Sequence, residues 1–162
     1  SYGGSVTLKE TGVLDFFTSG NYVFLDRDAY ETREEKDEIY RKSFSADYYF
    51  LSASAVTMDG EILNVDGNGN RIAAMIFGPK KVFVIIGMNK LTADIKEAEE
   101  RIRLYAGPMD AKVLSKQTPC TVTGECSDCR SPERICNKYL VYRREMNPDR
   151  MKVILINENL GY

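Results

Sequence analysis

The run KVFVIIG, at residues 81–87, is the feature that most restricts the fold. Its five consecutive apolar residues leave no polar face, so a strand with this sequence is buried on both sides. The next periodic segment, TADIKEAEERIRLYAG at residues 92–107, predicts an amphipathic helix with Thr92 as its N-cap and Gly107-Pro108 as its stop signal. A buried strand followed by such a helix is typical of an α/β domain with a mostly parallel sheet.

Other segments continue this alternation. Helices are predicted at residues 7–17, at REEKDEIYRKSF (33–44) and at RIAAMIF (71–77). Strands are predicted at YVFLD (22–26), from the start of DYYFLSASAVTM (47–58), at KYLVYRRE (138–145) and at MKVILINE (151–158). Asp59-Gly60 lies between two apolar runs and predicts an antiparallel hairpin. We expect a single α/β domain over residues 1–162, with KVFVIIG as a central strand followed by the 92–107 helix.

Size and charge exclude several classes of protein. A chain of 162 residues is long enough to bury a core, and its net charge of -2 gives no general attraction to nucleic acid or to anionic membranes. No apolar run reaches the length of a membrane helix, and no signal peptide is recognised. We therefore expect a cytoplasmic protein, in which thiols stay reduced.

Two glycine-rich loops are candidate anion sites. Gly3, Gly4, Ser5 and Thr7 precede or open a predicted helix, where glycines allow a ligand close to the backbone and hydroxyls add donors. The alternative is that Ser5 only caps the helix.

The second loop comprises Gly67, Asn68, Gly69 and Asn70 after Asp66. It can form a concave nest of N–H groups, and the guanidinium of Arg71 follows it. Its alternative is a plain turn, with Asn70 as a helix cap and Arg71 in solvent. We expect the two loops to meet at the carboxyl ends of the strands and to bind a small anionic metabolite; no nucleotide cofactor motif is evident.

All four cysteines lie within residues 116–137, at Cys120, Cys126, Cys129 and Cys136, with the spacing C-x5-C-x2-C-x6-C. Four thiolates suit tetrahedral zinc or an iron–sulfur cluster, and the single Cys-x2-Cys pair leaves the choice open. Disulfides in an oxidising compartment and four free thiols are the alternatives. We expect a local structural or redox role for this loop.

The chain has no histidine, which excludes histidine-based nucleophilic systems and histidine-ligated metals. Asp59, Glu61 and Asp66 lie close in sequence to the second glycine loop and are candidates for a carboxylate base; each is explained equally well as a solvated turn residue. The sequence leaves open whether the protein is an enzyme or a binding or accessory protein.

Four stretches together resemble the LUD (lactate-utilisation) domain family, and its short cysteine-containing branch most closely: GGSVTLKETGVLDFF, NVDGNGNRIAAMIFGPKKVFVIIGMNKL, TPCTVTGECSDCRSPERIC and VILINENLGY. The resemblance implies a Rossmann-like, three-layer fold related to ribose-5-phosphate isomerase, glucosamine-6-phosphate deaminase and CoA transferases, which bind phosphorylated sugars or acyl-CoA. It also implies a link to lactate oxidation and to iron–sulfur oxidoreductase partners, which favours a cluster at the cysteines.

The chain departs from the family at two places. Family members usually have further helices and a strand before the Gly-Gly-Ser loop. A loop of this type should leave a strand, so we expect that first strand and the helices to be missing from residues 1–162. Where the lactate-operon branch has a glutamate in a Glu-Thr-Gly-Thr segment, this chain has Met58, so a role tied to that glutamate is not carried over.

Overall fold

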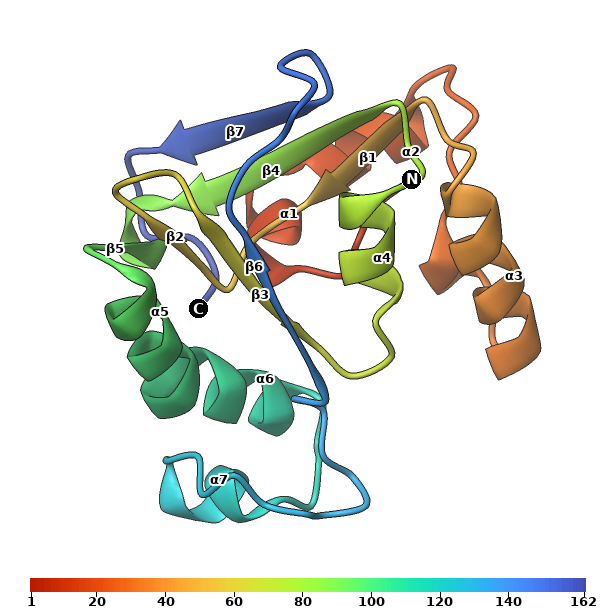
Figure 1. Ribbon diagram of the computed structural model, residues 1–162. Coiled ribbons are helices and arrows are strands. Elements are labelled where there is room, and N and C mark those ends of the chain that lie inside the picture. The colour runs from red at the N-terminus through yellow and green to blue at the C-terminus, as the bar shows by residue number, and fades with distance from the viewer. The chain divides into compact units, whose positions relative to one another are not determined.

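In the computed structural model, which describes residues 1–162, KVFVIIG forms strand β4 (Lys81–Gly87). It pairs in parallel with β1 (Tyr48–Leu51) on one side and with β7 (Met151–Ile156) on the other, as Figure 1 shows. Its buried residues include Val82, Val84 and Ile86, which are fully inaccessible to solvent. The predicted central strand is therefore confirmed.

The chain folds into two compact units, each built from separate stretches of sequence. The first contains Ser1–Ser52, Asn70–Met88 and Glu145–Gly161, and the second contains Ala53–Gly69, Asn89–Arg144 and Tyr162. The sequence patterns did not indicate this division. The chain passes from one unit to the other at Ser52 and Ala53, inside a segment whose apolar residues show no break at that point.

The first unit holds the β1-β4-β7 sheet together with five short helices. These helices are α1 (Val6–Glu10), α2 (Val13–Ser19), the 3-10 turn η1 (Arg27–Ala29), α3 (Arg33–Ser43) and α4 (Asn70–Ile76). Part of its core is Tyr2, Leu8 and Ile85, against which Phe24 and Phe50 pack.

The second unit holds a mixed sheet in the order β5-β2-β3-β6. Its strands are β2 (Ala55–Thr57), β3 (Ile62–Asp66), β5 (Leu91–Thr92) and β6 (Lys138–Tyr142). Strands β2 and β3 form the predicted antiparallel hairpin, and Gly60 has the positive φ of 85° that its turn requires.

Helices of the second unit follow the hairpin in sequence. They are α5 (Ile95–Arg101), a π-helical turn η3 (Ile102–Ala106), α6 (Gly107–Val113) and α7 (Pro119–Thr123); the 3-10 turn η2 (Met88–Lys90) precedes them. Ala98 and Ile102 pack against Ala55 and Leu63 of the mixed sheet. The α/β class, the mostly parallel sheet and the antiparallel hairpin are thus all confirmed.

The predicted helix at residues 92–107 is present with different ends. Asp94, and not Thr92, is the N-cap, because its side chain accepts the Glu97 N–H at 2.8 Å while Thr92 belongs to β5. Pro108 does not end the helical path: it lies in the first turn of α6, directly after the π-helical turn η3. In Figure 1, α5 and α6 follow one another along that path.

Two other predictions were wrong. YVFLD forms no strand: Val23 is 97% exposed, and Phe24 instead stacks on Tyr2 with ring centroids 5.4 Å apart. The predicted 7–17 helix is broken into α1 and α2 at Gly12, whose φ of 68° lies in the left-handed region.

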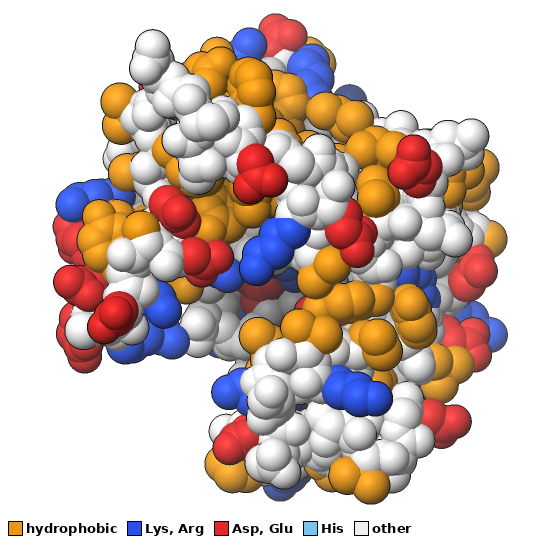
Figure 2. Space-filling model, turned by 180° about the vertical axis from the view of Figure 1, so that it is seen from behind, with side chains coloured by type: hydrophobic (Ala, Val, Ile, Leu, Met, Phe, Trp, Pro, Cys, Tyr) orange, Lys and Arg blue, Asp and Glu red, His pale blue; other side chains and the backbone are white.

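Lysine, arginine, aspartate and glutamate side chains are interspersed on the face drawn in Figure 2, without a continuous basic patch. This agrees with the small net charge of -2. None of the helices is both long and apolar enough to cross a membrane.

Candidate anion site and cysteine pocket

The Gly3–Gly4 loop begins at the edge of the parallel sheet. Tyr2 forms a parallel bridge with Phe50 of β1, and Phe50 N–H donates to the Ser1 carbonyl at 3.0 Å. Gly3 N–H then donates to the Phe50 carbonyl at 2.8 Å. The loop therefore leaves a strand-like segment, as expected for a loop of this type.

Arg71, in the first turn of α4, lies against Gly3. A Cβ added to Gly3 would lie 2.8 Å from Arg71 Cγ and 3.2 Å from the Tyr49 hydroxyl, so only glycine leaves room for the arginine stem. The Arg71 guanidinium donates to the Ser52 carbonyl, at 3.3 Å, directly after β1. Gly3 of the first loop and Arg71, which follows the second loop in sequence, therefore lie side by side within the first unit.

Arg27 lies against Gly4 in the same way. A Cβ added to Gly4 would clash with the Arg27 guanidinium, with its Cζ only 2.8 Å away. The guanidinium also lies over the rings of Tyr2 and Tyr40, at 5.7 and 5.8 Å from their centroids. Sequence reasoning missed Arg27, because the preceding run was interpreted as a strand and nothing marked the turn as facing the glycines.

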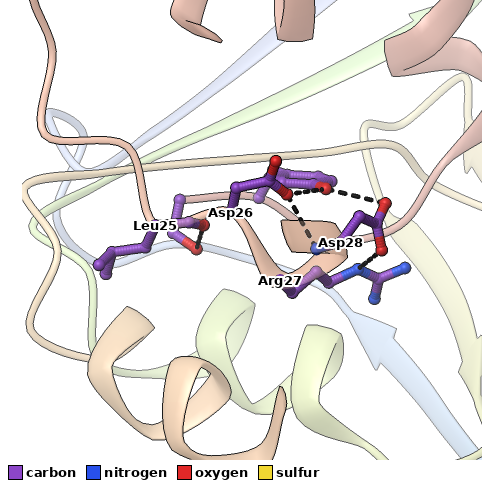
Figure 3. Close-up of polar contacts among 6 residues, drawn as sticks. Leu25, Asp26, Arg27 and Asp28 are labelled. Atoms are coloured by element: carbon purple, nitrogen blue, oxygen red, sulfur yellow. Dashed lines mark hydrogen bonds and ion pairs between the residues drawn. The ribbon is translucent and has the colours of Figure 1, made fainter. Parts of the chain in front are cut away.

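The electrostatic surroundings keep Arg27 charged. Burial lowers its pKa, but the neighbouring Tyr40, Asp28, Tyr2 and Tyr49 outweigh this effect and leave the pKa raised. Its Nε lies 3.4 Å from Asp28 Oδ1, an ion pair drawn in Figure 3, and this buried nitrogen has no hydrogen-bond acceptor within the protein. A buried donor without an acceptor is unusual and is expected to serve a ligand or a solvent molecule.

The Tyr2 hydroxyl holds the turn that carries Arg27. It donates to Asp26 Oδ1 at 2.8 Å and to Asp28 Oδ2 at 2.9 Å, and Figure 3 shows these contacts around the two labelled carboxylates. Asp26 Oδ1 also accepts the Asp28 N–H at 2.9 Å. Burial, together with these two carboxylates, raises the pKa of Tyr2 well above its ordinary value.

A Tyr2→Phe variant is expected to lose about 1–3 kcal/mol of stability below pH 10, through the loss of the hydroxyl bonds to carboxylates. Because the pKa of Tyr2 is raised in the folded state, the unfolded chain loses this proton first, above the ordinary pKa of 10.0. The hydroxyl's contribution to the free energy of unfolding is therefore complete below pH 10 and declines as the pH rises above that value. Urea unfolding at pH 8 and near pH 11 checks this: the gap between wild type and Tyr2→Phe should narrow at the higher pH, and a constant gap would contradict it. Tyr22→Phe, at a side chain 54% exposed, is the control.

The two hydroxyls of the first loop have internal partners. Ser5 is the N-cap of α1 and accepts the Leu8 N–H at 3.4 Å, as in the simpler of its two interpretations. Thr7 is fully buried, and its hydroxyl donates to the Leu160 carbonyl at 3.2 Å. Both residues therefore hold the loop in place through bonds within the protein.

The glycines of the second loop lie in the second unit, where they pack against the end of the cysteine segment. A Cβ on Gly67 would lie 3.2 Å from the Ile135 carbonyl, and one on Gly69, at φ 90°, would lie 2.6 Å from the Lys138 side chain. Lys138 Nζ donates to the Gly67 carbonyl at 2.7 Å, and the intervening Asn68 stays within this turn. Asn70 begins α4 in the first unit.

The three candidate acids occupy different positions in the second unit. Asp59 is exposed in the hairpin turn. Glu61, directly before β3, pairs with Arg143, directly after β6, with 2.6 Å between Oε1 and Nη1. Asp66 is 8% exposed at the end of β3, and its carbonyl accepts the Asn137 N–H at 3.1 Å.

The four cysteines line one small cavity of about 20 Å³ in the second unit. All four are free thiols, so no disulfide is formed. The thiols are not drawn together as ligands: no three cysteine, aspartate or glutamate side chains form a group that could hold a metal ion. Burial raises the pKa of Cys136, and the guanidinium of Arg134 partly offsets this rise.

Arg134 links the last two cysteines of the segment, Cys129 and Cys136, through their main chain. Its Nη1 donates to the Cys129 carbonyl at 2.6 Å and its Nε to the Cys136 carbonyl at 3.0 Å. Its Nη2 pairs with Asp128 at 2.7 Å. Three of its donor nitrogens are thus used inside a segment with little apolar content of its own.

The profile of the LUD domain matches residues 1–156, which is nearly the whole chain and includes parts of both units. The chain belongs to the LUD domain family. Membership associates this LUD protein with lactate utilisation.

Other comparisons add less. No curated protein matches the LUD chain. Among solved structures, it is similar to a DUF162 family protein from Deinococcus radiodurans, determined at 1.70 Å, with 12% identity and a TM-score of 0.39; the match covers 96% of this chain and 85% of that one. At this score the similarity adds nothing to the assignment.

Proposed function

We propose that this LUD protein binds a small anionic metabolite at a cluster formed by Gly3, Gly4, Arg27 and Arg71, here called the arginine–glycine cluster. One observation supports this most: two arginines from separate elements converge on adjacent glycines, where any larger residue would displace them. Arginine side chains beside adjacent glycines bring positive charge to a loop where a ligand can approach the backbone closely, and an anion is the ligand that this charge favours.

The cluster suits a phosphate or a carboxylate. Guanidinium groups bind both anions through paired N–H donors, and the Nε of Arg27, which lies 3.4 Å from Asp28 but makes no hydrogen bond, is one donor available to a ligand. Gly3 and Ser52 both lie at the carboxyl end of β1, which is where α/β sheets bind ligands. Phosphorylated sugars, acyl-CoA and small carboxylates such as lactate are the candidate ligands.

The proposal is for binding, and catalysis is a separate question. Asp28 pairs with Arg27, and Asp26 shares the Tyr2 hydroxyl with Asp28, so these two carboxylates lie beside the cluster. If ligands bind without turnover, a non-catalytic accessory role beside iron–sulfur oxidoreductases becomes the better account. We place either function in the cytoplasm, where four free thiols remain reduced.

Calorimetry with inorganic phosphate, a sugar phosphate, L-lactate and coenzyme A tests the proposal. Arg71→Ala is expected to weaken binding of the preferred anion about 10- to 100-fold, because a hydrogen bond to a charged group contributes about 1.5–3 kcal/mol. Its melting temperature should fall only slightly, and Arg71→Lys should restore part of the affinity. Arg41→Ala, an exposed arginine of α3, is the matched control. Equal binding by wild type and Arg71→Ala would refute the site.

A further inference from the structure

The cysteine cavity carries an inference that is independent of anion binding. The cavity is lined by all four thiols of the chain and measures about 20 Å³. An open cleft of about 460 Å³, lined partly by Cys129 and Cys136, adjoins it. The thiols therefore share one enclosed space that has an access route from solvent.

Polar groups already lie at hydrogen-bonding distance from the sulfurs of two cysteines. The Asp128 N–H donates to Cys126 Sγ at 3.4 Å, and Asp128 adopts φ 49°, which tightens the turn between Cys126 and Cys129. The Thr118 hydroxyl lies 3.2 Å from Cys120 Sγ. Donors of this kind stabilise thiolates and orient metal ligands, and they add little to neutral thiols.

Arg134 supplies the remaining part of the arrangement. Its bonds go to the main-chain carbonyls of Cys129 and Cys136 and to Asp128, so they hold the main chain of the segment, and the guanidinium also lies beside the Cys136 side chain. Four thiolates around a divalent ion carry a net charge of about -2. A guanidinium beside them offsets part of this charge.

The donor set fits a metal ion, and the cavity volume distinguishes between ions. Four sulfurs without histidine suit tetrahedral zinc or an iron–sulfur cluster. A cavity of about 20 Å³ has room for roughly one water-sized particle, so a single ion needs less rearrangement of the segment than a cluster of several iron and sulfide atoms. Since the thiols are not yet gathered as ligands, binding requires their side chains to turn toward a common centre.

We propose that Cys120, Cys126, Cys129 and Cys136 bind one zinc ion, with Arg134 as a positioning residue. The ion would cross-link a segment that is held by polar contacts, such as that between the Gln117 N–H and Glu133 at 2.7 Å. Its role is structural, and it takes part in no reaction step.

The test uses the full chain purified without oxygen. Elemental analysis is expected to find one zinc per chain and no stoichiometric iron or sulfide. Titration of the metal-free protein with cobalt should produce the intense bands of tetrahedral cobalt thiolate, and zinc should displace them. Cys126→Ser and Cys136→Ser should each abolish the bands, while Arg134→Ala should weaken zinc binding about 10- to 100-fold. Arg130→Ala removes the same charge from an exposed neighbouring position and should leave zinc binding unchanged.

Three results would overturn the proposal. Brown protein with iron and sulfide would show a cluster, and zinc binding that survives both cysteine substitutions would place the ion elsewhere. Four thiols that react equally fast with and without zinc would show that no ion binds. If a serine variant does not fold, cobalt titration and thiol protection of the wild type still decide the question.

Discussion

The double variant Arg27→Ala/Arg71→Ala is expected to lose binding of the preferred anion by about three orders of magnitude, or about 4 kcal/mol. Each guanidinium contributes hydrogen bonds to a charged ligand, and together they supply the positive charge beside Gly3 and Gly4. Calorimetry with wild type, both single variants and the double variant measures the effect. Arg41→Ala again controls for the loss of charge alone.

The four affinities also form a double-mutant cycle. If both arginines contact the same anion, the effects of the single substitutions should not add, and the coupling should exceed about 0.5 kcal/mol. Strictly additive effects would mean that the arginines act at separate places. Retention of wild-type affinity by the double variant would refute the arginine–glycine cluster as the binding site.

Leu8→Ala is expected to lower the free energy of unfolding by about 2–5 kcal/mol. Leu8 is completely buried in α1 and packs in the core cluster with Tyr2 and Ile85, so shortening it leaves a cavity beneath the Gly3–Gly4 loop. Urea unfolding of the wild type and the variant measures the difference. Lys9→Ala, on the exposed side of the same helix, should change stability by less than about 0.5 kcal/mol.

The same variant separates folding from binding. Where Leu8→Ala remains folded, its affinity for the anion should stay close to that of the wild type, since both arginines and both glycines are unchanged. A destabilisation below about 1 kcal/mol would contradict this prediction. It would mean that the neighbouring side chains, among them Val13 and Phe50, move to fill the space that Leu8 leaves.

Local sequence signals predicted local structure well. KVFVIIG was recognised as a central strand because five apolar residues in a row tolerate solvent on neither face. Asp59-Gly60 predicted the β2–β3 hairpin because few residues other than glycine adopt positive φ at low cost. The helix predicted from the charged, amphipathic run at residues 33–44 is α3, and it begins directly after a capping box in which Thr32 and Glu35 exchange hydrogen bonds.

The same signals failed where distant packing decided the outcome. DYYFLSASAVTM has the pattern of one strand. In the structure it supplies β1 and β2, which belong to different sheets, and the first unit ends at Ser52 while the second begins at Ala53. YVFLD is apolar because Tyr22 and Phe24 pack against aromatic rings, and ring packing leaves the same pattern as burial in a sheet.

The two candidate sites divide in the same way. The clustering of four cysteines and the glycines before Ser5 are visible in the sequence, since a short loop keeps neighbouring residues together whatever the fold. The contacts of Arg27 with Gly4 and of Arg71 with Gly3 cannot be recognised in the sequence, because they depend on how α1, η1 and α4 pack beside β1. Periodicity and turn chemistry act over a few residues, whereas a binding site requires side chains that are far apart in sequence to converge. That convergence is set by the packing of the whole unit.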